Sequence, residues 1–250
     1  MKKRQIEPNY LRPHCIAHRG LFDNTGDAPE NTIPAFKKAA DAGYGIELDV
    51  QLTMDKHIVV THDYDLKRIC NTDKLVNNLS YQELRQYKIF NSNELIPLFS
   101  EVLKVIDGKV PLLVEIKAEG VYEETCRLTA EILSAYSGVY IIESFSPHVV
   151  NWYRRNHPEI IRGQLADDFV KQRYFKSILL NLALTNMAFN VLTRPDFIAY
   201  NHYYSDKKCL KFWKKTLGCS LAAWTVKSQA ELDNISKIFD IIIFDGFMPK

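Results

Sequence analysis

Two histidines and a pair of carboxylates stand close together in the first quarter of the sequence. Glu47 and Asp49 alternate with apolar residues in the run Gly45–Val50, and His18 and His62 each follow a short apolar run. Histidine is the side chain whose ordinary pKa suits proton transfer near neutral pH. These residue types and their spacing indicate acid–base chemistry next to a concentration of negative charge.

The spacing of the two carboxylates predicts how they are presented. Successive side chains of a strand point to opposite faces, so Glu47 and Asp49 share one face of the strand Gly45–Leu52. Two adjacent ionised carboxylates repel each other, and a cation that lies between them removes that cost. Oxygen ligands of this kind favour a hard divalent ion, Mg²⁺ or Ca²⁺. An edge strand with two solvated acids is the alternative that this pattern leaves open.

Composition excludes several classes of protein. The 250 residues are 46% hydrophobic and 25% charged, with a formal net charge of +2 and no dense Lys/Arg run, so a nucleic-acid partner is not expected. Five cysteines without a CxxC pair indicate free thiols in a reducing compartment. The leader Met1–His14 lacks the apolar core of a signal peptide, which favours the cytoplasm. The most apolar segment, Ser177–Leu192, contains four interrupting polar residues and is too short to span a membrane.

Strand and helix patterns alternate along the whole chain. Alternation implies a parallel sheet, and eight such units in this length imply an α/β fold of the closed TIM (β/α)8 barrel type, with residues 1–250 as a single domain. The polar segment Tyr64–Pro97 is expected to be a small insertion beside the barrel, with a helix near Ser80–Tyr87. The run His57–Thr61 is expected to form a hairpin with the second strand. The expected barrel strands are Cys15–His18, Gly45–Leu52, Val110–Lys117, Val139–Phe145, Ile160–Ala166, Asp196–Asn201, Ser220–Val226 and Ile241–Asp245.

Polar side chains gather at or near the carboxyl ends of these strands, which is where barrels of this type place their functional residues. Residues from distant parts of the chain are therefore expected to converge on one mouth: His18, Glu47, Asp49, Glu115, Ser144, Trp224 and Asp245.

Short motifs in a fixed order resemble one known family. HRG at 18–20, APENT at 28–32, ELDV at 47–50, HD at 62–63 and EIK at 115–117 closely resemble the glycerophosphodiester phosphodiesterase family. SFSP, AWTV and the terminal IIIFDGFMP also look like landmarks of that family. The resemblance implies a TIM barrel with a small insertion after its second strand. It also implies a phosphoric diester hydrolase that converts a small glycerophosphodiester to glycerol 3-phosphate and an alcohol.

The resemblance also implies a role for each motif residue. His18 and His62 match the catalytic histidines, and Glu47, Asp49 and Glu115 match the ligands of a divalent metal, Mg²⁺ or Ca²⁺. Substrate contacts fall to Arg19 and Lys117, which match phosphate-facing residues, and to Trp224, which matches an aromatic residue of the pocket. Glu30, with Asn31, is expected to fix its loop and to support the first histidine. Which histidine is the base, and whether water or a glycerol hydroxyl attacks phosphorus, stay open.

Departures from the family pattern concern substrate choice. Residues that are more usual at the rim of the barrel are replaced at three places: Leu98, Lys227 and Phe244-Asp245-Gly246. Two other readings remain: a lysophospholipase D or phospholipase on the same barrel, and a barrel without catalysis that binds phosphodiesters or a protein. The segment Ile178–Leu192 leaves open a peripheral contact with lipid, although an apolar periodic stretch is expected to face the core. Arg19 and Lys117 could be structural partners of the carboxylates, and Trp224 could be plain core. The sequence does not predict the oligomeric state.

Overall fold

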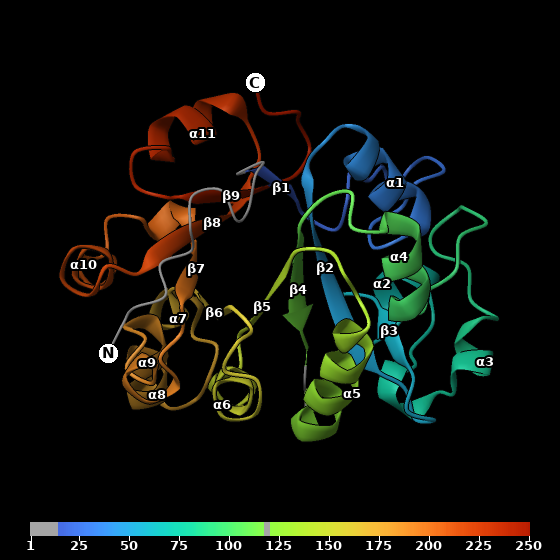
Figure 1. The fold of residues 1–250 in the computed structure, drawn as a ribbon, viewed down its shortest axis with the longest axis horizontal. Helices are drawn as coiled ribbons and strands as arrows, with labels where there is room; N and C mark the ends of the chain where they lie inside the picture. Colours follow the sequence, from blue (N-terminus) through green and yellow to red (C-terminus); the bar gives the residue numbers. More distant parts are fainter. Residues whose placement is uncertain (1–14, 118–120) are drawn as a thin grey trace. The chain divides into compact units, whose positions relative to one another are not determined.

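The computed structural model describes residues 15–117 and 121–250, so the leader Met1–His14 lies outside the described residues. The chain forms two compact units, Ile16–Tyr140 and Ile141–Lys250, and Cys15 belongs to the second. Figure 1 shows the elements of both.

The first unit is built on β2, whose eight residues are all buried. The strand β2 pairs in parallel with β1 and with β4, and in antiparallel with β3, which confirms the hairpin. The strands of this unit are β1 (Cys15–Ala17), β2 (Gly45–Leu52), β3 (Ile58–Val60) and β4 (Leu112–Ile116). Its helices are α1 (Ile33–Asp41), α2 (Lys67–Cys70), η1 (Val76–Asn78), α3 (Tyr81–Leu84), α4 (Phe99–Ile106) and α5 (Tyr122–Ser134).

The loop between β1 and α1 requires glycine at position 20. Gly20 has a positive φ of 83°, and a Cβ there would lie 2.8 Å from the backbone carbon of Ala35 on α1. Only glycine allows this approach, which brings the end of β1 against the start of the helix. Thr32 occupies the N-cap position of α1, but its side chain makes no capping bond and donates instead to the carbonyl of Pro29.

The expected insertion has its own small core. Short helices α2, η1 and α3 follow one another in residues 67–84, and Ser80 and Glu83 form a capping box at α3. This part of the chain buries Leu66, Ile69, Val76, Leu79, Leu84, Ile89 and Ile96 together with Val59 of β3. Residues 64–97 are therefore more ordered than their polar composition indicated.

The second unit continues the alternation of strands and helices. Each of its strands pairs in parallel with the next one in sequence, from β5 to β9. The strands are β5 (Tyr140–Ser144), β6 (Arg162–Ala166), β7 (Phe197–Asn201), β8 (Ser220–Val226) and β9 (Ile241–Phe244). The helical segments are α6 (Pro147–Asn156), α7 (Phe169–Gln172), α8 (Ile178–Thr185), α9 (Asn190–Thr193), η2 (His202–Tyr204), α10 (Lys208–Lys211), η3 (Phe212–Thr216) and α11 (Gln229–Ile235).

Two expectations about this unit need correction. The sequence pattern of Ser205–Thr216 predicts one helix, but the structure has the short α10 followed by the wider η3, and η2 precedes this segment. The expectation that the apolar side chains of Ile178–Leu192 face the core is wrong for α8, because the buried side chains of this helix are Asn181 and Thr185. Among the residues that the structure describes, no helix combines the length and the apolar character that crossing a bilayer requires.

Candidate active site

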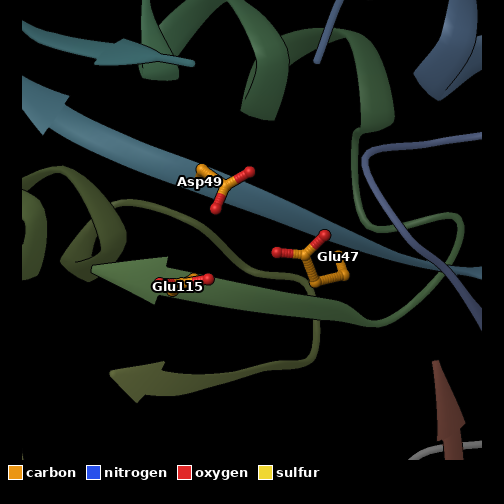
Figure 2. A group of neighbouring side chains, drawn as sticks. All are labelled: Glu47, Asp49 and Glu115. Carbon is orange, nitrogen blue, oxygen red and sulfur yellow. The ribbon is translucent and has the colours of Figure 1, made fainter. Parts of the chain in front are cut away.

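Three buried carboxylates meet on neighbouring strands of the first unit. Glu47 and Asp49 lie on the same face of β2, and Glu115 of β4 is the register partner of Asp49. One carboxylate oxygen of each lies within 4.8 Å of the others. Figure 2 shows the three side chains gathered over β2 and β4. The alternation read from the sequence therefore places the two acids of β2 correctly, and the parallel register brings the third acid to them.

Two basic side chains partly balance this charge. The Nζ atom of Lys117 lies 2.8 Å from Glu115 Oε1 and 3.3 Å from Asp49 Oδ1, and Arg19 Nε lies 3.5 Å from Asp49 Oδ2. Asn31 donates a hydrogen bond of 2.8 Å from Nδ2 to Asp49 Oδ2. The contacts are those of an ion-paired cluster, so they are compatible with a structural as well as a substrate-binding role for both cations.

The carboxylates respond differently to burial. Burial would raise the pKa of Asp49, but the charges of Lys117, His62 and Arg19 outweigh it and hold that pKa below its ordinary value. For Glu115, burial raises the pKa, and the charge of Asp49 adds to the rise while Lys117 opposes it. Burial lowers the pKa of Lys117, but the charges of Glu115 and Asp49 raise this pKa by more than burial lowers it. The pKa therefore lies above its ordinary value, and the ammonium stays charged. The positive charges near Glu115 therefore do not offset the effects of its burial and of the charge of Asp49 on its pKa.

The three carboxylates fit a divalent ion. All ligand atoms are oxygens, which is the donor set that Mg²⁺ and Ca²⁺ prefer. Asp49 Oδ1 is buried and accepts no hydrogen bond, and the ammonium of Lys117 lies 3.3 Å from it. A metal ion would add the close contact that this longer ion pair does not supply to a buried carboxylate oxygen.

The loop after β1 aims its groups at the carboxylates. Arg19 adopts a left-handed backbone conformation with φ 56°, and its N–H donates to Glu47 Oε2 at 2.9 Å. Asn31 is also left-handed, and its N–H donates to the carbonyl of Arg19. His18 Nε2 lies 3.9 Å from Glu47 Oε2. The loop therefore places His18 and Arg19 beside β2 by means of backbone geometry.

His62 is fixed by two neighbours. Gln51 of β2 donates from Nε2 to the carbonyls of Thr61, His62 and Asp63, which fixes the turn after β3. His62 Nδ1 lies 2.6 Å from Asp63 Oδ1. Burial would raise the pKa of Asp63, but its bonds with His62 and Arg68 lower that pKa, so the carboxylate is ionised. An ionised carboxylate accepts, so we assign the Nδ1 proton to His62, which directs Nε2 to other partners.

Arg68 of α2 connects the two halves of this site. Its Nε donates to Asp63 Oδ2 at 2.6 Å, and its Nη1 and Nη2 both donate to the carboxylate of Glu30 at 2.7 Å. Glu30 also accepts from Arg19 Nη1 at 2.6 Å and from Asn24. Burial opposes ionisation of Glu30, but these donors lower its pKa to about 2. The structure thus gives Glu30 a role in holding Arg19.

The sequence did not reveal the part that Arg68 plays. It lies in a segment that read as an irregular insertion, and nothing in its neighbours marks an arginine that bridges two loops. Its contacts arise from tertiary packing of α2 against the Ala28–Thr32 loop and the turn at His62, so only the structure shows them.

Trp224 lies on β8 in the second unit. Its ring packs edge-on against Phe145 with centroids 5.6 Å apart, and its Nε1 is buried without a hydrogen-bond partner. Phe145 in turn packs edge-on against Phe169. The tryptophan belongs to an aromatic cluster of this unit, and its role in lining a substrate pocket stays a prediction.

Known proteins resemble this chain over nearly its whole length. The sequence model of the Glycerophosphoryl diester phosphodiesterase family matches residues 18–246. The Bacillus subtilis protein YhdW, to which glycerophosphodiester phosphodiesterase activity is ascribed, is 37% identical over 235 residues, which cover 86% of this chain and 87% of YhdW. A glycerophosphodiester phosphodiesterase of Caldanaerobacter subterraneus subsp. tengcongensis is 29% identical over 241 residues, with 91% of each chain covered.

Solved structures agree with the fold. A phosphodiesterase of Oleispira antarctica, solved in complex with the product sn-glycerol 3-phosphate, gives a TM-score of 0.75 at 24% identity and covers 92% of each chain. The glycerophosphodiester phosphodiesterase of Thermotoga maritima gives a TM-score of 0.71 at 24% identity and covers 92% of this chain and 93% of its own. These likenesses, with the alternation of parallel strands and helices, confirm the (β/α)8 TIM-barrel fold class. The chain belongs to the glycerophosphoryl diester phosphodiesterase family.

Proposed function

We propose that this protein hydrolyses glycerophosphodiesters to sn-glycerol 3-phosphate and an alcohol at the site on β2 and β4. The observation that carries the proposal is the buried cluster of Glu47, Asp49 and Glu115, which fits a divalent ion. Family membership and the names of the relatives support the reaction class.

Charge explains why these residues suit a phosphodiester. The substrate is an anion, and negative charge grows on the phosphoryl oxygens as a nucleophile attacks phosphorus. A divalent ion held by Glu47, Asp49 and Glu115 would supply Lewis-acid stabilisation of that charge. Arg19 and Lys117 carry fixed positive charge at the same cluster. We propose that both side chains also interact electrostatically with the substrate phosphate.

The histidines supply proton transfer in this proposal. His62, with its Nδ1 proton held by Asp63, offers Nε2 to a proton donor or acceptor. His18 lies beside Glu47 at the other end of the cluster. One of the two takes the proton of the nucleophile, and the other gives a proton to the departing alcohol oxygen. Water and the substrate's free glycerol hydroxyl are both available as nucleophile, and the second would produce a cyclic phosphate first.

Two features support finer parts of the proposal. No disulfide joins the five cysteines, all of which the structure describes, and this supports action in the reducing cytoplasm. The departures at Leu98, Lys227 and Phe244 support a head-group preference that differs from other family members.

The test is release of sn-glycerol 3-phosphate from glycerophosphocholine and glycerophosphoethanolamine by the full chain. We expect release from at least one of them and a decrease of roughly 10²–10⁴-fold in kcat for His62→Asn and for His18→Asn, the usual span for a lost acid or base. The matched control is His157→Asn, because His157 lies on the surface outside the site. Full activity of both variants would refute the histidine roles. Hydrolysis of lysophosphatidylcholine alone would favour the lysophospholipase D reading.

A further inference from the structure

The polarity of helix α8 is inverted. The side chains that it buries are Asn181 and Thr185, whereas Ile178 and Leu179 are 66% and 76% exposed and Leu182 is also exposed. In an ordinary surface helix the apolar stripe faces the core and the polar residues face water. Helix α8 therefore presents to its surroundings the side chains that a helix normally hides.

Helix α9, which follows through a short turn, repeats this inversion. Asn190 and Thr193 are buried, whereas Val191 and Leu192 are 69% and 67% exposed. The Ala188 N–H donates to the carbonyl of Ala183 and closes the turn between the helices. Figure 1 shows α8 and α9 as neighbouring segments. Two successive helices thus expose apolar side chains and bury polar ones.

Specific hydrogen bonds hold α8 in this orientation. Asn181 accepts from the N–H of Phe175 at 3.0 Å and donates to the carbonyl of Phe175 at 2.8 Å. Thr185 Oγ1 accepts from the N–H of Val170 at 3.2 Å. Turning the helix to bury its leucines would break these bonds and leave buried backbone groups unpaired. These bonds therefore specify the exposure of the apolar side chains of α8, whereas the buried side-chain atoms of Asn190 and Thr193 on α9 make no hydrogen bond.

These exposed side chains form a set that we name the α8–α9 apolar face: Tyr174, Ile178, Leu179, Leu182, Val191 and Leu192. Single exposed apolar residues are common on any protein surface. A concentration of them in one segment marks a surface that meets another apolar phase or partner.

Charge indicates what meets this face. The 27 residues between Asp168 and Asp196 contain no acidic residue, but they contain Lys171, Arg173, Lys176 and Arg194, all of which are exposed. Over the whole chain, 32 basic and 30 acidic residues are almost balanced. Exposed apolar helical side chains whose neighbours in the sequence are exposed basic residues match the boundary between the head groups and acyl chains of an anionic bilayer.

We propose that the α8–α9 apolar face docks this protein on the surface of an anionic phospholipid membrane. The leucine, isoleucine and valine side chains enter the head-group boundary, and the basic side chains lie at the lipid phosphates. This inference does not depend on the proposed hydrolysis, because none of its residues belongs to the carboxylate cluster and its test measures binding.

The test is co-sedimentation of the full chain with vesicles of phosphatidylcholine alone and of phosphatidylcholine containing about one quarter phosphatidylglycerol. We expect binding to the anionic vesicles, and at least roughly tenfold weaker binding by the double variant Leu179→Gln with Leu192→Gln. The double variant Arg173→Gln with Lys176→Gln is expected to lower binding to the anionic vesicles. The matched control is Met54→Gln with Leu75→Gln, since both residues are exposed apolar side chains of the first unit. It should bind like the unchanged protein.

Three outcomes would overturn the proposal. The unchanged protein could fail to sediment with either vesicle. The control could lose as much binding as the leucine variant. The protein could ignore vesicles but form a dimer in light scattering that Leu179→Gln with Leu192→Gln dissociates, which would make the face a contact between copies. Melting temperatures of all variants are measured in parallel, so that unfolding is not mistaken for lost binding.

Discussion

At the residue scale, the arginine of α2 joins features that lie far apart in the sequence. Arg68 bonds Asp63, which holds His62, and it bonds Glu30, which holds Arg19. A guanidinium can serve both carboxylates because its donors form a rigid fork. Arg68 is therefore a positioning residue that acts on a histidine and a cation together.

Replacing Arg68 by Gln is expected to lower kcat by roughly 10–100-fold, the span typical of lost outer-shell partners. Asp63 would lose the donor that lowers its pKa, and His62 would be less firmly held, so the pH profile of kcat should also shift. Arg68→Lys should restore little of the lost kcat, because an ammonium cannot reproduce the three hydrogen bonds that the planar guanidinium makes to Asp63 and Glu30. The control is Lys67→Gln on the same helix, an exposed position. An unchanged rate and pH profile for Arg68→Gln would contradict the positioning role.

The pH dependence of the free energy of unfolding in acid provides a second prediction at this scale. The pKa of Glu30 is lowered from 4.5 to about 2 in the folded protein, because its donors outweigh the cost of burial. A carboxylate whose pKa falls on folding stabilises the fold above its unfolded pKa and loses that contribution as pH falls through the folded pKa. The free-energy difference of unfolding between the unchanged protein and Glu30→Gln should therefore narrow from about pH 5 downward.

Urea unfolding at several pH values between about 5 and 3 checks this expectation. Glu131→Gln is the matched control, since Glu131 is an exposed carboxylate on α5. The free energy of unfolding of Glu131→Gln should change with pH in parallel with that of the unchanged protein. A constant gap between the unchanged protein and Glu30→Gln over this range would show that Glu30 is not stabilised by ionisation.

At the element scale, sequence patterns predicted which side chains share a face better than where that face points. Alternation in Gly45–Val50 put Glu47 and Asp49 on one side of β2, and the structure confirms it. Helical spacing in Ile178–Leu192 likewise grouped its apolar residues, but the inward direction inferred for them was wrong. Periodicity carries no information about the hydrogen bonds of Asn181 that fix α8, because these depend on Phe175 in the preceding loop.

The capping box of α3 gives a prediction at this scale. Ser80 and Glu83 exchange bonds at the start of a helix that seats Leu84 in the small core of residues 64–97. Removing an N-cap hydroxyl costs about 1 kcal/mol. Ser80→Ala should lower the unfolding free energy by about that amount without changing kcat. Gln82→Ala on the same helix is the control, since Gln82 is exposed. A lower kcat of Ser80→Ala would contradict a purely structural role.

At the scale of the whole molecule, the alternation of strands and helices carried the fold prediction, and family motifs carried the site. The sequence could show that polar residues follow many strands, but it could not show the register by which β4 brings Glu115 opposite Asp49. That register comes from backbone pairing between residues that are 66 positions apart in the sequence, which local patterns do not encode. The single-domain expectation for residues 1–250 stays a prediction.

The central claim is that hydrolysis depends on a divalent ion held by the three buried carboxylates. The most direct measurement is release of sn-glycerol 3-phosphate with EDTA present and then with Mg²⁺ or Ca²⁺ restored, for the unchanged protein, Glu47→Gln and the surface control Glu131→Gln. We predict that EDTA stops release by the unchanged protein and by Glu131→Gln, that a divalent ion restores it, and that Glu47→Gln stays inactive while keeping its melting temperature. Release that persists in EDTA, or full activity of Glu47→Gln, would contradict the claim.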